Sequence, residues 1–312
     1  MQEIRVGLIG CGGRGRGHAR HIAAIDGAVM TAVCDLDEAR RTTAACELGG
    51  VATYAAPERM LEAESPDAVV VAVPPEFNAP VAQICLEAGV HTLLEKPPGL
   101  HVSQTRALLE ISERTGARCM IGLNRRFNPA IREAKRLICE RGPLTTIVGE
   151  FHKNLVDIEE RGILKPPVLD RYFYETPVHA LDCVRALADS PVAEVHSLSG
   201  SFFSGYRDVY GGLILFESGC VAHLVANVTA GARLERYEMH GRSASAYLEG
   251  VRSGQVIIDG QVTELTCSGD DSTREQNRYF IDRVRDGRPF GPPACDLHEA
   301  ILSMELIDRL FG

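Results

Sequence analysis

The chain has 312 residues, which is long for a single domain and enough for two. Its 45% hydrophobic and 24% charged residues are typical of a globular protein and argue against disorder. The net charge of −9 argues against a nucleic-acid partner, and no apolar run approaches the length of a membrane span.

The ten cysteines are scattered along the chain and form no CxxC pair, so we interpret them as reduced thiols. The segment before the first predicted strand is only a few residues long, which leaves no room for a signal peptide. Both features predict a cytoplasmic protein.

The first predicted strand, residues 4–9, leads directly into a glycine-rich turn that opens a helix through residues 18–25. In a GxGxxG turn the first glycine allows the tight bend, the second lets the backbone approach a pyrophosphate, and the third lets helix and strand pack closely. The helix start offers free N–H groups to the phosphates. We therefore predict dinucleotide binding by the whole turn, Gly10-Cys11-Gly12-Gly13-Arg14-Gly15.

A second predicted strand, residues 29–34, ends at Asp35, which lies 20 residues beyond Gly15. This is the spacing expected for a carboxylate that binds ribose hydroxyls. Because Asp35 would repel a 2′-phosphate, the sequence favours NAD over NADP. Arg40 and Arg41, on the next predicted helix, keep NADP possible.

The alternation of strands and helices continues to residue 123 and predicts an α/β Rossmann domain, residues 1–123, with a doubly wound parallel sheet. The further strands are expected at 51–54, 67–73, 90–94 and 119–123, and the helices at 37–48, 57–63, 77–88 and 103–115.

Two proline pairs, Pro74-Pro75 and Pro97-Pro98, end the expected strands 67–73 and 90–94, because proline cannot extend a central strand. Glu95 and Lys96 therefore lie at the carboxyl end of a strand, where open α/β sheets present their ligand sites. A charged pair that closes a strand is usually just solvated, so a role for Lys96 depends on its neighbours.

Residues 124–312 predict an α+β domain with a large, mainly antiparallel open sheet, whose terminal helix is able to pack back on the first domain. Its strands are expected at 144–152, 192–203, 208–217, 219–228, 234–240, 244–249 and 255–266. Its helices are expected at 128–141, 176–188, 273–286 and 296–311. Residues 153–171 are expected to form a surface loop.

Within the helix that starts near Thr176, His179 and Asp182 share a face, while Glu175 precedes the expected N-cap. A metal site would need a further ligand cluster, which the sequence lacks, so we predict no metal. An isolated histidine is most often a satisfied core residue. Together with Lys96, however, Glu175 and His179 are candidate catalytic residues.

Six motifs in this order resemble the Gfo/Idh/MocA family of NAD(P)-dependent oxidoreductases, which includes glucose–fructose oxidoreductase and inositol dehydrogenase. They are the glycine turn, Asp35, Val73-Pro74-Pro75, Glu95-Lys96-Pro97, Gly122-Leu123-Asn124-Arg125-Arg126-Phe127-Asn128-Pro129 and Glu175-Thr176-Pro177-Val178-His179-Ala180-Leu181-Asp182.

The resemblance implies roles for single residues. Lys96 would bind substrate and help to move the hydroxyl proton, and its peptide bond to Pro97 is often cis in relatives. Glu175 and His179 would correspond to the family's DxxxH pair, with glutamate in place of aspartate. The resemblance also implies cofactor contacts from Val73, Pro74, Asn78, Glu95 and Lys96. Asn78 stands where the family often has histidine. Substrate contacts are implied for Lys96, Arg125, Arg126, Glu175 and His179.

The sequence thus predicts an NAD-dependent oxidoreductase that moves a hydride between nicotinamide and a secondary hydroxyl or ketone of a sugar, cyclitol or related polyol. Either Lys96 or His179 would accept the proton. Two alternatives stay open: an NAD-retaining glycosidase or epimerase-like enzyme that oxidises transiently, and a non-catalytic cofactor-sensing protein. Alternating apolar residues in 213–216 and 221–225 predict a homodimer or homotetramer through the sheet of the second domain.

Overall fold

The computed structural model describes residues 3–269 and 271–312, so Met1 and Gln2 lie outside the described residues. The chain forms two compact units. The first contains residues 1–123 and 273–302, and the second contains residues 124–272 and 303–312. The division after Leu123 lies where the sequence analysis places it, but the second unit is not the continuous stretch 124–312. Residues 273–302 return to the first unit, where they supply an edge strand and buried hydrogen bonds.

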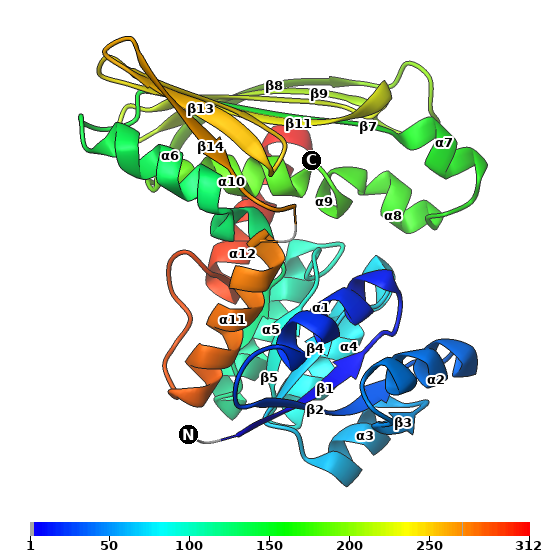
Figure 1. The fold of residues 1–312 in the computed structure, drawn as a ribbon. Coiled ribbons are helices and arrows are strands. Elements are labelled where there is room, and N and C mark those ends of the chain that lie inside the picture. Colours follow the sequence, from blue (N-terminus) through cyan, green and yellow to red (C-terminus); the bar gives the residue numbers. More distant parts are fainter. Residues whose placement is uncertain (1–2, 270) are drawn as a thin grey trace. The chain divides into compact units, whose positions relative to one another are not determined.

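The first unit is a seven-stranded sheet in the order β15-β6-β5-β4-β1-β2-β3, with helices on both faces (Figure 1). The first six strands in chain order are parallel, and β15 is antiparallel to β6. The predicted doubly wound Rossmann sheet is confirmed. Its strands are β1 (Ile4–Ile9), β2 (Ala28–Cys34), β3 (Ala52–Tyr54), β4 (Ala68–Val71), β5 (His91–Leu94), β6 (Cys119–Ile121) and β15 (Cys295–Asp296). Its helices are α1 (Gly13–Ala23), α2 (Glu38–Glu47), α3 (Pro57–Glu64), α4 (Pro75–Glu87), α5 (Val102–Thr115) and most of α11 (Asp271–Arg285).

The central strand β4 shows why this sheet forms. Its four residues, Ala-Val-Val-Val, are all completely buried, as expected for a parallel strand that helices cover on both faces. The adjacent β1 is followed directly by Gly10, which has a φ of +94°. A Cβ at Gly10 would lie 2.3 Å from the backbone oxygen of Ala72, so only glycine allows β1 and the exit of β4 to approach this closely.

The second unit is built around an eight-stranded sheet in the order β14-β13-β12-β11-β7-β10-β9-β8. Only β7 and β10 pair in parallel, so the predicted large, mainly antiparallel sheet is confirmed. Its strands are β7 (Thr146–Asn154), β8 (Val192–Gly200), β9 (Val209–Phe216), β10 (Val221–Asn227), β11 (Thr229–Gly241), β12 (Ala244–Glu249), β13 (Ser253–Ile258) and β14 (Gln261–Thr266). Its helices are the 3-10 helix η1 (Asn124–Phe127), α6 (Pro129–Cys139), α7 (Leu155–Glu160), α8 (Pro166–Asp170), α9 (Tyr172–Glu175), α10 (Val178–Ala188) and the end of α12 (Leu297–Phe311).

Helices α6 and α10 lie along one face of this sheet (Figure 1). Strand β10 shows the division between the faces, because Ala222, Leu224 and Ala226 are buried while His223 and Val225 are exposed. The side chains that point away from the helices include several large apolar residues, namely Leu213, Leu215, Val225, Tyr247 and Val262.

Two local expectations were wrong. Residues 153–171 are not a loop but hold the short helices α7 and α8. Helix α10 starts at Val178 with Pro177 as its N-cap, so Thr176 is not the cap. Within the expected stretch 255–266, a turn at Asp259-Gly260 is confirmed: both residues adopt positive φ angles, and the turn joins β13 and β14 in a hairpin.

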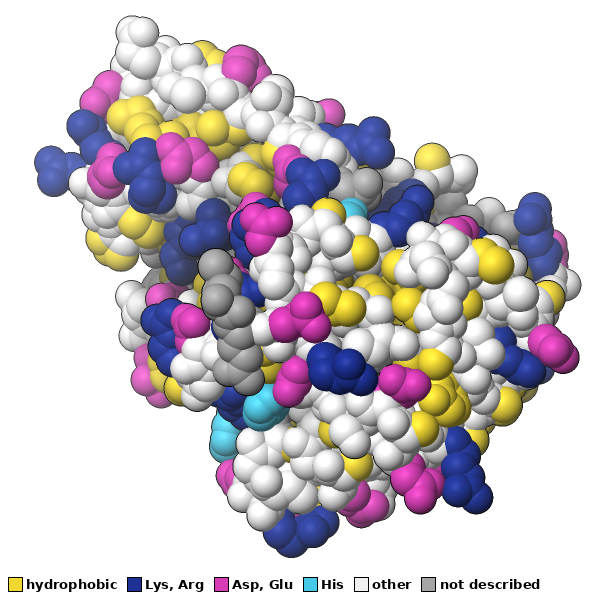
Figure 2. All heavy atoms as spheres, turned by 60° about the horizontal axis from the view of Figure 1, so that its bottom comes forward, with side chains coloured by type: hydrophobic (Ala, Val, Ile, Leu, Met, Phe, Trp, Pro, Cys, Tyr) yellow, Lys and Arg dark blue, Asp and Glu magenta, His cyan; other side chains and the backbone are white. Residues whose placement is uncertain are grey.

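The described residues contain no helix long and apolar enough to cross a membrane. All ten cysteines lie within the described ranges and are free thiols. On the face shown in Figure 2, basic and acidic side chains are interspersed rather than gathered into one basic patch.

Candidate active site

The glycine turn between β1 and α1 is shaped by two close backbone contacts. A Cβ at Gly15 would lie 1.9 Å from the backbone oxygen of Gly10, and a Cβ at Gly10 would meet Ala72 and, at 3.1 Å, the nitrogen of Val73. At Gly12, by contrast, a Cβ would meet nothing within 4 Å, and this N-cap residue makes no side-chain cap to α1. The turn is therefore tight on its inner side and open on its outer side, which suits a pyrophosphate at a helix start.

Asp35, at the end of β2, faces this turn. Its Oδ2 accepts a hydrogen bond from the backbone nitrogen of Cys11 at 2.7 Å, and its Oδ1 accepts one from Asp37 at 2.9 Å. A pocket of about 480 Å³ lies beside it. The pocket is lined by Cys11, Gly12, Gly13, Arg16, Asp37, Ala39, Arg40 and Thr43. An open turn, a carboxylate and an adjacent hollow fit the pyrophosphate, ribose and base of a dinucleotide.

Cys11 contributes its backbone rather than its thiol. The side chain is 1% exposed and its Sγ lies 3.6 Å from the carbonyl oxygen of Cys34. Burial, reinforced by the charge of Asp35, raises the pKa of the Cys11 thiol to about 12, so no thiolate forms near neutral pH.

Lys96 lies two residues beyond β5, at the same carboxyl edge as the glycine turn and half-buried. Its peptide bond to Pro97 is cis. The backbone nitrogen of Lys96 donates to Oε2 of Glu95 at 3.3 Å. Asn78, which is completely buried in the first turn of α4, donates from Nδ2 to the carbonyl oxygens of Glu95 and Pro97 at 3.1 and 2.8 Å. Pro74, the exposed N-cap of α4, lies at the start of the same helix.

The carboxylate of Glu95 is directed into the first unit and forms a buried cluster. Its Oε1 pairs with Nε of Arg14 at 2.7 Å and with Nε2 of His18 at 2.8 Å. Nδ1 of His18 lies 2.8 Å from Oδ1 of Asn277. Glu95 and Asn78 thus contact protein groups around the turn at Lys96, and the cofactor contacts expected of them stay a prediction. His18 and Asn277 were not predictable from the sequence, because His18 meets Glu95 across 77 positions and Asn277 across 259.

Burial by itself would raise the pKa of Glu95, but Arg14 and His18 outweigh it and hold this pKa well below its usual range. In the unfolded chain the pKa of a glutamate is about 4.3. Because the pKa of Glu95 is lower in the folded protein, the ionised carboxylate stabilises the fold at pH values above about 4.3. This stabilisation is lost as the pH falls further, since the unfolded state then binds more protons.

We expect the free energy of unfolding to decrease below about pH 4.3 and to do so less steeply in Glu95→Gln, as measured by urea unfolding between pH 3 and 7. Glu62→Gln, an exposed glutamate, is the matched control, and an unchanged slope in Glu95→Gln would contradict the assignment.

In the second unit, Glu175 ends α9 and His179 lies in the first turn of α10. His179 is 7% exposed and its backbone nitrogen donates to the carbonyl oxygen of Thr176 at 3.2 Å. Lys153, from the end of β7, reaches the same turn, with its Nζ 3.5 Å from Oγ1 of Thr176. The structure therefore brings Glu175, His179 and Lys153 to one turn.

Helix α10 is anchored by a buried ion pair one turn after His179. Asp182 is completely buried and binds Arg126 through two hydrogen bonds, of 2.7 and 2.8 Å. Oγ of Ser303 donates to the same carboxylate at 2.8 Å. Gly149 in β7 lets the helix pack closely, since a Cβ there would lie 2.7 Å from Val184. These contacts fix the helix that carries His179.

Arg125 forms a second buried ion pair. Its Nε and Nη2 each donate to a carboxylate oxygen of Glu235 at 2.7 Å, and the hydroxyl of Tyr237 donates to Oε1 at 2.8 Å. Burial by itself would raise the pKa of Glu235, but Arg125 outweighs it and holds this pKa below its usual value. Glu235 and Asp182 thus engage the guanidinium groups of Arg125 and Arg126, and the substrate contacts expected of the two arginines stay a prediction.

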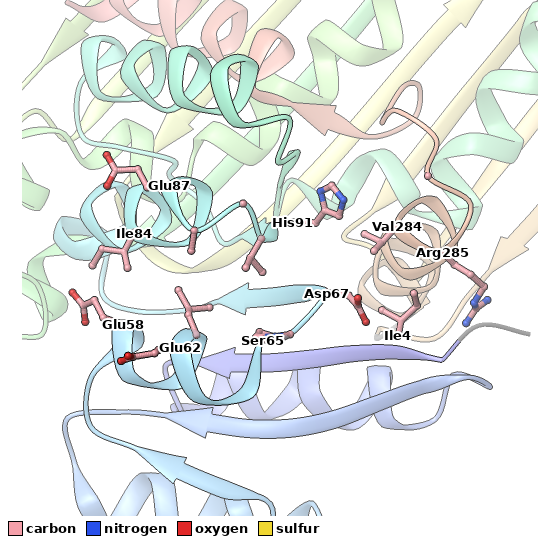
Figure 3. A pocket seen from close by; sticks show the side chains of 16 residues that line it. Ile4, Glu58, Glu62, Ser65, Asp67, Ile84, Glu87, His91, Val284 and Arg285 are labelled. Carbon is pink, nitrogen blue, oxygen red and sulfur yellow. The ribbon is translucent and has the colours of Figure 1, made fainter.

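A larger hollow of about 990 Å³ lies at the opposite, amino-terminal edge of the first sheet (Figure 3). Its labelled side chains include Ile4 and His91, the first residues of β1 and β5, and the acidic Glu58, Glu62 and Glu87. The glycine turn, Asp35 and Lys96 do not line it. We therefore place the cofactor at the carboxyl edge. The described residues hold no cluster of three or more His, Cys, Asp or Glu side chains that could bind a metal ion.

The fold and the carboxyl-edge site define an NAD-binding oxidoreductase. Residues 4–123 match the model of the oxidoreductase family with an NAD-binding Rossmann fold. These residues therefore form a Rossmann domain of the Gfo/Idh/MocA type. The cofactor is NAD. Binding of NAD by the glycine turn and Asp35 stays a prediction, which the contact between Cys11 and Asp35 fits.

Two curated relatives match over nearly the whole chain. An inositol 2-dehydrogenase of Corynebacterium glutamicum is 26% identical, covering 97% of this chain and 93% of the relative. A scyllo-inositol 2-dehydrogenase (NAD(+)) of Bacillus subtilis is also 26% identical, covering 97% and 92%. Among solved structures, a UDP-N-acetylglucosamine 3-dehydrogenase from Acidithiobacillus ferrooxidans has a TM-score of 0.84 at 22% identity, covering 99% and 97% of the two chains. This last similarity concerns the fold.

Proposed function

We propose that the protein oxidises a secondary hydroxyl of an inositol or a closely related polyol, with NAD as hydride acceptor. The observation that carries the proposal is the placement of Lys96, which lies at the carboxyl edge of the sheet beside the glycine turn. The two whole-length relatives named as inositol dehydrogenases support this substrate class.

The residues of the glycine turn would hold the pyrophosphate, and Asp35 would accept hydrogen bonds from the adenosine ribose. When bound, the nicotinamide supplies a hydride acceptor. Lys96 belongs to the first unit, whereas Glu175 and His179 belong to the second, and their joint action on one substrate is part of this proposal. Either the neutral amine of Lys96 would take the hydroxyl proton, or its ammonium form would stabilise the developing alkoxide while the ring of His179 takes the proton. Glu175 would bind a neighbouring hydroxyl.

The exposed apolar face of the second sheet supports a homo-oligomer. Leu213, Leu215, Val225 and Tyr247 point away from the helices that cover the other face, and a large apolar surface of this kind is expected to meet a partner. We propose that a second copy of the chain covers it, in a dimer or a tetramer. The ten free thiols support a cytoplasmic location, where cysteines stay reduced.

The test is an assay of myo-inositol, scyllo-inositol and a panel of sugars for net NADH formation, followed by the near-ultraviolet absorbance. We expect stoichiometric NADH with at least one inositol, and a higher kcat/KM with NAD than with NADP because Asp35 repels a 2′-phosphate. A hydride-returning glycosidase or epimerase-like enzyme would convert substrate without net NADH. Absence of turnover on the whole panel, with NAD still bound, would favour a cofactor-sensing protein and contradict the proposal.

A further inference from the structure

The backbone around Lys96 is held by side chains from two other elements. Asn78, in the first turn of α4, donates from one amide nitrogen to the carbonyl oxygens of Glu95 and Pro97, the residues on either side of Lys96. The nitrogen of Lys96 itself donates to the Glu95 carboxylate, which Arg14 and His18 fix from α1. The peptide group before Lys96 and the one after Pro97 are thereby held on either side of the lysine.

The chemistry of these contacts requires a side chain with two donors. Both partners of Asn78 are carbonyl oxygens, which only accept hydrogen bonds. The amide nitrogen of Asn78 must therefore face them, because the opposite amide orientation would point the acceptor Oδ1 at two other acceptors. Oδ1 is buried and accepts no hydrogen bond from the described part of the chain. An unsatisfied buried acceptor costs stability, about 1–3 kcal/mol in typical cases. The same amide nevertheless supplies both donors to the carbonyl groups that flank Lys96, so its contacts are concentrated on the backbone of the lysine turn.

We propose that Asn78 is a positioning residue of the reaction, which aims the Lys96 side chain at the substrate by fixing the backbone on both sides of it. The inference rests on the catalytic role proposed for Lys96. A lysine has four side-chain torsions, so its ammonium group can be placed reproducibly only if its backbone is fixed. A misplacement of about 1 Å in a catalytic group can cost roughly 100-fold in rate. Asn78 therefore acts through Lys96 rather than on the cofactor.

The first test reads the backbone directly and needs no substrate. Asn78→Leu keeps the size of the side chain and removes both donors. We expect hydrogen exchange, read by mass spectrometry in a peptide spanning residues 92–100, to become about tenfold faster or more, while a peptide over β6 is unchanged. Because residues 97 and 98 are prolines, the amides of Glu95 and Lys96 dominate the signal near the turn. Unchanged exchange in this peptide would overturn the proposal.

The matched control is Cys85→Ala, which removes a completely buried side chain from the same helix α4 without touching the turn. It should lower the melting temperature but leave exchange in residues 92–100 as in the wild type. If Cys85→Ala accelerates exchange there as strongly as Asn78→Leu, the effect is one of general destabilisation and the proposal is overturned.

The second test is a double-mutant cycle with Lys96→Ala, measured as kcat with myo-inositol and NAD. Asn78→Leu should lower kcat by about 10- to 100-fold in the wild-type background and by less than about twofold in the Lys96→Ala background, with the NAD KM unchanged in both. Equal losses in the two backgrounds would overturn the positioning role. Full activity of Lys96→Ala alone would instead overturn the proposed function, so the two failures are distinguishable.

Discussion

Replacement of Lys96 by alanine is expected to lower kcat for the oxidised polyol by about 10²- to 10⁴-fold, the usual contribution of a positioned acid–base group. The dissociation constant for NAD should change by less than about threefold, because the glycine turn and Asp35 do not depend on the lysine side chain. Stopped-flow or steady-state NADH formation measures the first quantity, and quenching of tyrosine fluorescence or calorimetry measures the second.

Lys135→Ala is a suitable control, since Lys135 lies on α6 and contacts only the backbone of Ala186 and the exposed Asp189 among the contacts described. It should retain wild-type kcat. A Lys96→Ala variant with full turnover would remove the lysine from the mechanism. A variant that loses NAD binding and turnover together would show that Lys96 serves the cofactor rather than the hydroxyl.

Replacement of Arg125 by methionine is expected to lower the free energy of unfolding by about 3–5 kcal/mol, because it leaves the Glu235 carboxylate buried without its bidentate partner. The double variant Arg125→Met/Glu235→Leu should recover most of this loss, since it removes both charges and keeps apolar bulk. Urea unfolding followed by circular dichroism measures the three free energies.

The control for this prediction is an exposed ion pair. Arg59 and Glu62 lie 3.0 Å apart, but both side chains are more than 70% exposed. Arg59→Met should therefore cost less than about 1 kcal/mol. If the double variant at positions 125 and 235 is as unstable as the single one, the buried charge is not the cause of the loss.

The first unit was largely predictable because its signals are local. Strands such as residues 68–71 are continuous apolar runs, the glycine turn directly follows β1, and proline pairs mark the ends of β4 and β5. The carboxyl-edge position of Lys96 follows from these features alone. The antiparallel sheet was likewise visible in its alternating strands and short turns.

The contacts that organise the site could not be predicted, because each joins residues far apart in the chain. Glu95 meets His18 across 77 positions, and Arg125 meets Glu235 across 110. Sequence reasoning therefore predicted substrate contacts for Arg125 and Arg126 without identifying their carboxylate partners, Glu235 and Asp182. The helices α7 and α8 have only six and five residues, too few to show a helical period, and were interpreted as a loop.

The two-residue strand β15 and Asn277 have a consequence for biosynthesis. Domains commonly fold from the N-terminus while the chain is still being made. Here the edge partner of β6 and the hydrogen-bond partner of His18 come from residues 277–296, near the end of the chain. A ribosome-bound chain that has emerged only as far as residue 123 would expose the β6 edge and lack the residue that holds His18. The cofactor-binding fold is thus completed only after residues 277–296 have been made.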